Sequence, residues 1–114
     1  MRAQITHRME KVGPETVAIL DDVTSGTFTF RKSGWLRAIE WESSNYASAA
    51  TFTIAIADAD GFTLYTSGAL AHDSSGYIAD INRIIVDEEH TVTVTTGDPG
   101  VGGASINVTL LMER

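Results

Sequence analysis

The residues of this chain that could do chemistry are mostly acidic side chains. Asp58 and Asp60 stand two apart before Gly61, as alternate carboxylates do at the start of a calcium-binding loop. A helix-flanked calcium loop also needs a third polar ligand after Asp60 and a glutamate at its twelfth position. Gly61 follows Asp60 directly, and Ala69 occupies the twelfth position. Because an Asp-Gly pair is typical of a tight hairpin, we expect a turn here rather than a metal site.

The histidines and serines form no recognisable catalytic set. His7, His72 and His90 are far apart and have no neighbour at zinc-site spacing, which predicts that each is a surface or loop residue. The sequence has no Gly-x-Ser-x-Gly motif and no cysteine, and Asp73-Ser74 beside His72 shows no further sign of a triad. We therefore expect no enzyme, no cofactor and no bound metal.

Charge limits the partners that the chain can have. The sequence has 15 acidic and 8 basic residues and a net charge of −7, which repels a phosphate backbone. Arg31-Lys32 with Arg37 is the nearest approach to a basic stripe and is typical of a strand end. The acids at Asp21-Asp22 and Asp87-Glu88-Glu89 are typical of solvated turns. No apolar run approaches the length of a membrane span, and neither nucleic acid nor a membrane is an expected partner.

The elements that must position these residues are β-strands. In residues 51–57, Phe52, Ile54 and Ile56 lie on one face and small residues lie on the other. The same alternation occurs in 91–95 and 105–110, and a weaker form occurs in 17–20, 27–30 and 62–65. Together with the intervening turn residues, this predicts an all-β, antiparallel two-sheet sandwich, jelly-roll-like, with about eight or nine strands.

The length of the chain suits a single β-sandwich domain over residues 1–114. Residues 1–15 are a possible N-terminal arm or edge strand, and Gln4-Ile5-Thr6 could begin it. The Gly-rich run 97–103 is predicted to be a loop. The inward faces of the strands should meet in one core. That core is predicted to contain Phe28, Phe30, Ile39, Phe52, Ile54, Ile56, Leu64, Val92, Val94, Ile106, Val108 and Leu110.

One predicted strand, 34–42, has two mixed faces. Trp35, Arg37, Ile39 and Trp41 alternate with Leu36, Ala38, Glu40 and Glu42. Such a strand either passes between the core and a subunit contact or bends at a bulge. Residues 67–82 form the longest irregular stretch, and a long loop in a small domain binds something or is held by a neighbour. The candidate interface residues are therefore Trp35, Trp41, Tyr46, His72 and Tyr77.

Most of the chain resembles a known kind of protein. The segment Ala-Asp-Ala-Asp-Gly-Phe-Thr-Leu-Tyr-Thr-Ser-Gly at 57–68 is followed by a long loop, the Thr-rich strand after His90, a Gly-rich turn and a closing strand to Leu111. Over about residues 26–112 this arrangement resembles small β-sandwich structural proteins of tailed-phage particles, most of all capsid decoration (cement) proteins.

The resemblance implies a virion structural protein without enzymatic activity. It implies a homo-oligomer, with a trimer as the expected state, that binds the phage major capsid protein on the outer capsid surface after synthesis in the host cytoplasm. Two other functions stay open. One is a neck or tail component of the particle. The other is a carbohydrate- or ligand-binding sandwich, in which Trp35, Trp41 and Tyr77 would supply stacking platforms.

Overall fold

In a computed structural model, which describes residues 8–48 and 50–114, the chain consists of β-strands and connecting turns. The nine strands of this part of the chain are β1 (Met9–Ile19), β2 (Ser25–Arg31), β3 (Gly34–Ser43), β4 (Thr53–Ala57), β5 (Thr63–Thr66), β6 (Ser75–Ile78), β7 (Arg83–Ile85), β8 (Glu89–Thr95) and β9 (Ala104–Glu113). Within the same residues, no helix is long and apolar enough to cross a membrane.

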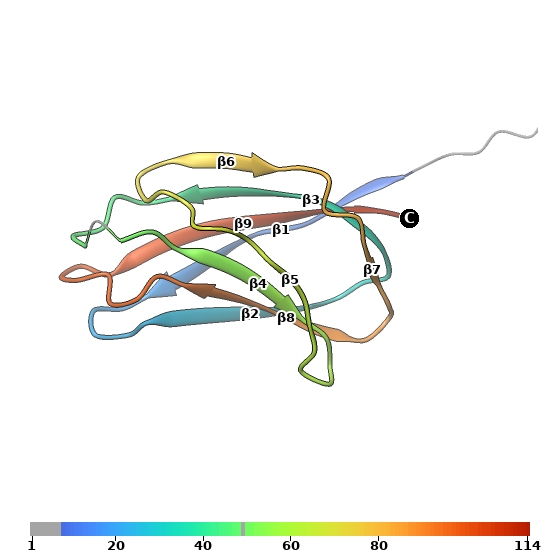
Figure 1. Cartoon of the computed structure of the whole chain (residues 1–114), viewed down its shortest axis with the longest axis horizontal. Coiled ribbons are helices and arrows are strands. Elements are labelled where there is room, and N and C mark those ends of the chain that lie inside the picture. Colours follow the sequence, from blue (N-terminus) through green and yellow to red (C-terminus); the bar gives the residue numbers. More distant parts are fainter. Residues whose placement is uncertain (1–7, 49) are drawn as a thin grey trace, which may run out of the picture.

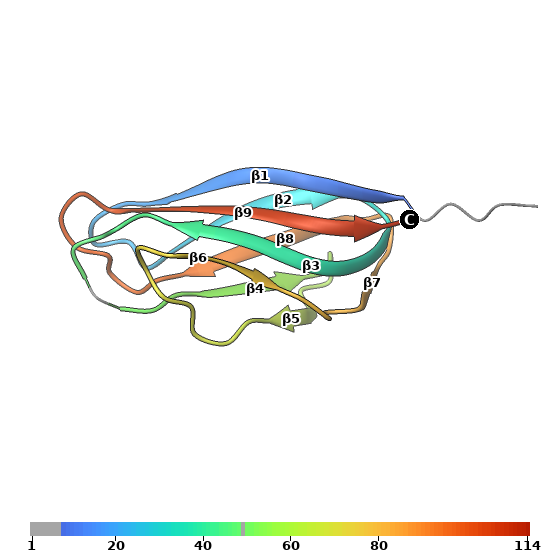
Figure 2. The ribbon, with the colours of Figure 1, turned by 90° about the horizontal axis from the view of Figure 1, so that it is seen from above.

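The strands form two sheets that face each other (Figures 1 and 2). One sheet has five strands in the order β1-β9-β3-β6, with β7 also paired to β3, and the other has four in the order β2-β8-β4-β5. All of these pairings are antiparallel. Apart from β4–β5 and β6–β7, every connection crosses from one sheet to the other, as in a jelly roll. The predicted fold class is confirmed.

The core lies between the two sheets, where the inward side chains of both meet. All of the predicted core residues are buried, except Phe28 and Leu64, which are partly buried and pack against the others. The alternation of apolar and polar residues was a sufficient signal because each of these strands has one face toward solvent. Further core residues, which were not among the predicted ones, are Val17, Ile19, Leu36, Tyr46, Ile81, Ile85, Ala104 and Met112.

The mixed faces of β3 result from a bulge. The register between β3 and β9 shifts between Leu36 and Ala38, and the consecutive residues Ala38 and Ile39 are both buried. A bulge inserts one residue and moves the side chains after it to the opposite face. Trp35, before the bulge, is therefore exposed, whereas Trp41, after it, packs against the core. Of the two explanations considered for this strand, the bulge is confirmed.

The loop predicted at 67–82 is wrong in its central part. Ser75–Ile78 is the edge strand β6, and it pairs with Ile39–Glu42 of β3. This segment has little apolar alternation, and its structure depends on the hydrogen-bonding edge that β3 offers. Gly76 fits there because it lies opposite Trp41, where a Cβ atom would come within 2.5 Å of the indole ring.

Two other parts of the chain differ from or extend the predictions. Strand β7 was not predicted, because Arg83–Ile85 is too short to show alternation. At the other end of the chain, residues 9–15 belong to β1, an edge strand that pairs with β9. The possible arm at Gln4-Ile5-Thr6 lies outside the described residues.

The prediction that His90 is a surface or loop residue is wrong. His90 lies in β8, is fully buried and stacks on Phe30 with ring centroids 5.4 Å apart. It occupies the next inward position before Val92 and Val94, so the alternation of β8 extends to it. Its Nδ1 lies 2.9 Å from the carbonyl oxygen of Glu88. His72 lies in a loop, as expected, and His7 lies outside the described residues.

Candidate functional site

The Asp-Gly segment forms the predicted hairpin turn between β4 and β5. Oδ1 of Asp58 accepts hydrogen bonds from the backbone N–H groups of Asp60, at 3.0 Å, and of Phe62, at 2.9 Å. Gly61 has φ of 85°, a left-handed conformation that favours glycine. The carboxylate of Asp58 therefore holds the turn together.

Three other carboxylates meet at one end of the sandwich. Ligand oxygens of Asp21, Asp22 and Asp98 all lie within 4.8 Å of one another, and the three residues are exposed. Oδ1 of Asp98 accepts hydrogen bonds from the backbone N–H groups of Gly100 and Asp22, and these lower the pKa of Asp98. Desolvation raises the pKa of Asp21, and the charges of Asp22 and Asp98 add to this effect.

Among the described residues, these three carboxylates are the group of side chains that lie close enough together to bind one cation. Asp21-Asp22 was predicted to be a solvated turn, and Asp98 was not predicted to lie beside it. Asp22 and Asp98 are 76 residues apart, and the pairings of β1 with β9 and of β2 with β8 place their two turns side by side. No local sequence signal indicates such a meeting.

Polar side chains form two rows across the outer face of the five-stranded sheet. In one row Tyr77 of β6 lies opposite Glu40 of β3, which lies opposite Thr109 of β9. In the second row, the residues in order from β6 to β1 are Ser75, Glu42, Asn107 and Thr16. Residues paired in this way point to the same side of a sheet. The face opposite the core is therefore rich in hydrogen-bonding groups.

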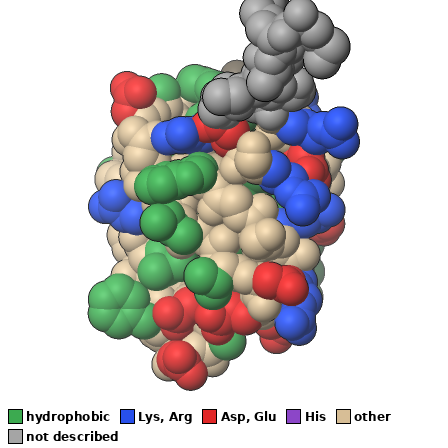
Figure 3. Space-filling model, turned by 90° about the vertical axis from the view of Figure 1, so that its right-hand side faces the viewer, with side chains coloured by type: hydrophobic (Ala, Val, Ile, Leu, Met, Phe, Trp, Pro, Cys, Tyr) green, Lys and Arg blue, Asp and Glu red, His purple; other side chains and the backbone are tan. Residues whose placement is uncertain are grey.

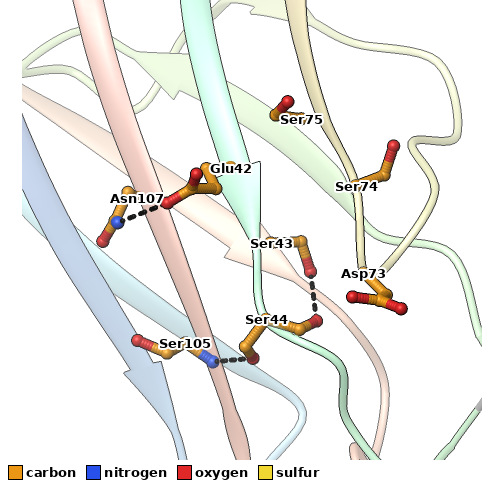
Figure 4. Close-up of a pocket in the computed structure, with 8 residues that line it drawn as sticks. All are labelled: Glu42, Ser43, Ser44, Asp73, Ser74, Ser75, Ser105 and Asn107. Atoms are coloured by element: carbon orange, nitrogen blue, oxygen red, sulfur yellow. Dashed lines mark hydrogen bonds between the residues drawn. The ribbon is translucent and has the colours of Figure 1, made fainter.

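Apart from Thr16, the residues of the two rows line a shallow groove, which we call the outer groove and which has two adjoining parts. One part, of about 480 Å³, is lined by Pro14, Glu40, Trp41, Glu42, Ser75, Gly76, Tyr77, Asn107 and Thr109. The other part, of about 440 Å³, is lined by Glu42, Ser43, Ser44, Asp73, Ser74, Ser75, Ser105 and Asn107 (Figure 4). The two parts share Glu42, Ser75 and Asn107, so they are continuous.

Hydrogen bonds hold several groups of the outer groove in place. The amide nitrogen of Asn107 donates to Oε1 of Glu42 at 3.4 Å, and Oγ1 of Thr16 donates to Oδ1 of Asn107 at 2.7 Å. The ammonium of Lys11 lies 3.6 Å from Oε1 of Glu40. Each carboxylate has a second oxygen and further lone pairs, which leaves hydrogen-bonding capacity toward the groove.

The five candidate interface residues do not form one surface. Tyr77 is 61% exposed in the outer groove, and Trp41 also contributes to its lining. Tyr46 is buried, and its hydroxyl donates to the carbonyl oxygen of Ala50 at 2.6 Å, so its ring has little surface to offer a partner. The ring of His72 lies 5.0 Å from that of Tyr46. Trp35 lies at the opposite end of β3 from the bulge-shifted Trp41.

Trp35 belongs to an exposed apolar surface that the sequence analysis did not identify. It is 41% exposed and is paired with Ile84 of β7, which is 60% exposed, and Val86 beyond β7 is 51% exposed. The guanidinium of Arg37 lies 5.1 Å from the centre of the Trp35 ring. Figure 3, which faces this end of the molecule, shows a band of hydrophobic side chains. We call Trp35, Ile84 and Val86 the apolar end.

The outer face of the four-stranded sheet is a second unusual surface, which we call the threonine face. Its outward positions alternate with the core residues of β2, β8, β4 and β5 and are paired across all four strands. The uncharged ones are Ser25, Thr27, Thr29, Thr53, Ala55, Ala57, Thr63, Thr66, Thr91, Thr93 and Thr95, and these make up the threonine face. The remaining outward pair of β2 and β8, Arg31 with Glu89, is charged and borders this face at one end.

Several solved structures have a similar fold. The viral capsid protein STIV MCP matches with a TM-score of 0.56 and 16% identity, over 96% of this chain and 49% of that chain. The T13 viral particle of infectious bursal disease virus matches with a TM-score of 0.54 and 12% identity, over 94% of this chain and 31% of that chain. The carbohydrate-binding module CBM36, in complex with calcium and xylotriose, matches with a TM-score of 0.50 and 15% identity, over 94% of this chain and 99% of that chain.

These similarities define the class of the protein as a β-sandwich of the kind found in viral capsid proteins and in a carbohydrate-binding module. Sandwich domains of larger enzymes, such as an α-L-arabinofuranosidase, have the same fold. At these identities the similarity establishes the fold alone. No protein-family model matches the chain, and no curated protein matches it in sequence.

Proposed function

We propose that this protein is a virion structural protein, a decoration or cement protein that forms a homotrimer and binds the major capsid protein on the outer surface of a tailed-phage shell. Three findings support the proposal: the resemblance of the sequence over about residues 26–112, the fold shared with viral capsid proteins, and two surfaces suited to assembly. The proposed setting of the protein is the virion, after synthesis in the host cytoplasm.

The threonine face is the observation that supports assembly most directly. Two copies with a net charge of −7 repel each other over most of their surface. An uncharged face of small side chains is the region where this repulsion and the cost of desolvating charges are smallest. Because its side chains are short, two backbones can approach closely there. We assign the contact between copies to this face.

The apolar end supports the contact with the shell. Trp35, Ile84 and Val86 expose apolar surface at one end of the sandwich, where a partner would bury it. Aromatic residues are common at the centres of protein interfaces, and rim charges such as that of Arg37 add specificity. A partner bound to the apolar end would leave the outer groove, on another part of the five-stranded sheet, accessible.

A neck or tail component is the alternative within the particle. It would use the same surfaces, but its partner would be another structural protein rather than the major capsid protein. Binding to empty shells that lack necks and tails distinguishes the two, because only a decoration protein binds at a copy number comparable with that of the capsid lattice.

Light scattering with one pair of variants tests the contact between copies. We expect the wild-type protein to scatter as a trimer and Thr93→Glu, at the centre of the threonine face, to scatter as a monomer. Thr16→Glu adds the same charge to an exposed strand of the other sheet, and we expect this control to remain a trimer. Circular dichroism checks that each variant is folded. A wild-type protein that is a monomer at all concentrations contradicts the assembly proposal.

A further inference from the structure

We propose that the outer groove is a saccharide-binding site, with Tyr77 as its stacking platform and Glu42 and Asn107 as its main hydrogen-bonding groups. This inference does not depend on the proposed role in the virion, because the groove is separate from both the threonine face and the apolar end. It assigns a ligand class to the groove, where four strands bring together residues that are far apart in the sequence.

The first argument is the position of Tyr77. Its ring is 61% exposed although it lies in a strand, and it forms one side of the groove beside Glu40. The C–H groups of a pyranose ring form an apolar patch that stacks on an aromatic face, while the phenolic hydroxyl stays wet. An exposed aromatic ring next to a polar groove provides both kinds of surface that a sugar requires.

The second argument is the hydrogen-bonding capacity of the side chains that line the outer groove. Glu42 offers carboxylate oxygens that accept from sugar hydroxyls, and such charge-assisted bonds are stronger than neutral ones. Asn107 both donates and accepts, and Oδ1 of Asn107 is oriented by Thr16. Ser74 and Ser75 add hydroxyls that act in either direction, as sugar hydroxyls themselves do (Figure 4). The lining of the outer groove is therefore complementary to a ligand that carries many hydroxyl groups.

The third argument is charge, which disfavours anionic and apolar ligands in the outer groove. Glu40, Glu42 and Asp73 make the lining acidic, and the whole chain is acidic as well. An anionic ligand such as a phosphate or a sulfated glycan is repelled. An apolar peptide would leave the carboxylates desolvated without partners. A neutral saccharide satisfies them with hydroxyl donors. Each part of the groove, about 440 and 480 Å³, can accommodate a sugar ring.

The test is a titration of the isotope-labelled protein with neutral trisaccharides, followed by nuclear magnetic resonance. The probes are xylotriose, cellotriose, maltotriose and the trimer of N-acetylglucosamine. We expect at least one to shift the backbone amide signals of β3, β6 and β9 around the groove. No shift with any probe at millimolar concentration overturns the proposal, as does a set of shifts confined to another surface.

Three variants test the residue assignments. Loss of the stacking ring in Tyr77→Ala should weaken binding about tenfold or more. Glu42→Gln keeps the shape but removes the charge, and it should weaken binding about fivefold. Phe62→Ala removes another exposed aromatic ring, from the β4–β5 turn, and should leave the affinity unchanged. The exposed position of Tyr77 predicts an unchanged melting temperature, so a loss of binding would not reflect unfolding. Binding that is unchanged in Tyr77→Ala overturns the assignment.

Discussion

The rings of Trp41 and Phe52 pack edge to face, with ring centroids 5.3 Å apart and an angle of 82° between the rings. Trp41 lies in β3 of the five-stranded sheet, and Phe52 lies directly before β4 of the four-stranded sheet. This contact therefore joins the two sheets. It also explains why Trp41 is less available for an interface than the sequence indicated.

Trp41→Ala should lower the free energy of unfolding by about 3 kcal/mol, because it removes an aromatic contact between the sheets and leaves a cavity. Trp35→Ala is the matched control. Its ring is largely outside the core, so its loss should cost less than about 1 kcal/mol, including the stacking of Arg37. Urea unfolding of both variants measures the difference. Equal losses would show that the bulge does not separate the two tryptophans as described.

Ile54→Ala should lower the free energy of unfolding by about 2 to 5 kcal/mol, the range for a truncated core side chain. Ile54 is fully buried, whereas Ile84 is 60% exposed. Ile84→Ala should therefore cost less than about 1 kcal/mol in the isolated protein. A loss below about 0.5 kcal/mol for Ile54→Ala, as for surface substitutions, would show that β4 is assigned to the wrong register.

Asp58→Ala should destabilise the fold by about 1 to 2 kcal/mol, since one carboxylate oxygen accepts two backbone hydrogen bonds in the β4–β5 turn. Asp60→Ala is the control, because the side chain of Asp60 is exposed at the tip of the same turn. It should change stability by less than about 0.5 kcal/mol. Thermal unfolding separates the two variants. If Asp60→Ala were the more harmful, the turn would have a different geometry.

Stability should fall as the pH falls below about 4, the range in which carboxylates are protonated. The pKa of Asp98 is lowered by hydrogen bonds from the backbone N–H groups of Gly100 and Asp22, and the pKa of Glu10 is lowered by Arg114 and Lys32. A carboxyl group with a lowered native pKa stabilises the fold above its unfolded pKa, and this contribution is lost as the pH falls through the native value. Asp21, with a raised pKa, acts in the opposite direction.

Asp98→Asn isolates one part of this pH dependence. The amide oxygen can still accept the two backbone hydrogen bonds, but it does not ionise in this range. Carboxyl groups titrate over about pH 5 to pH 3. Between these two pH values, the urea midpoint of the variant should therefore change less than that of the wild-type protein. An identical decline in the two proteins would show that Asp98 does not contribute to it.

The sequence predicted the fold where each strand has one buried face. Ile54 and Ile56, like Val92 and Val94, alternate with small residues, so their inward direction follows from the period of the strand. It did not predict β6, because Ser75-Gly76-Tyr77 has no alternation and is held by the edge of β3. His90 was assigned to the surface by its residue type, although its position in the alternation places it inward.

The candidate sites were less predictable than the core. Glu42 and Asn107 are 65 residues apart, and only the register between β3 and β9 makes them neighbours. Tyr77 was singled out by type, but its partners were not. Similarly, Trp35 was predicted as an interface residue, whereas its contact with Ile84 depends on the pairing of β7 with β3. Register is set by packing of the whole sandwich and is not encoded in any single segment.

Co-sedimentation with empty shells of the cognate phage, prepared without this protein, tests the proposed decoration function most directly. We expect the wild-type protein to sediment with the shells up to a saturating copy number. The heat stability of the shells should rise with occupancy, because a ligand that binds only the assembled state stabilises it by mass action. The double variant Trp35→Asp with Ile84→Asp should stay in the supernatant, whereas Tyr77→Ala should still bind. A wild-type protein that stays in the supernatant and leaves the melting of the shells unchanged would contradict the proposed function.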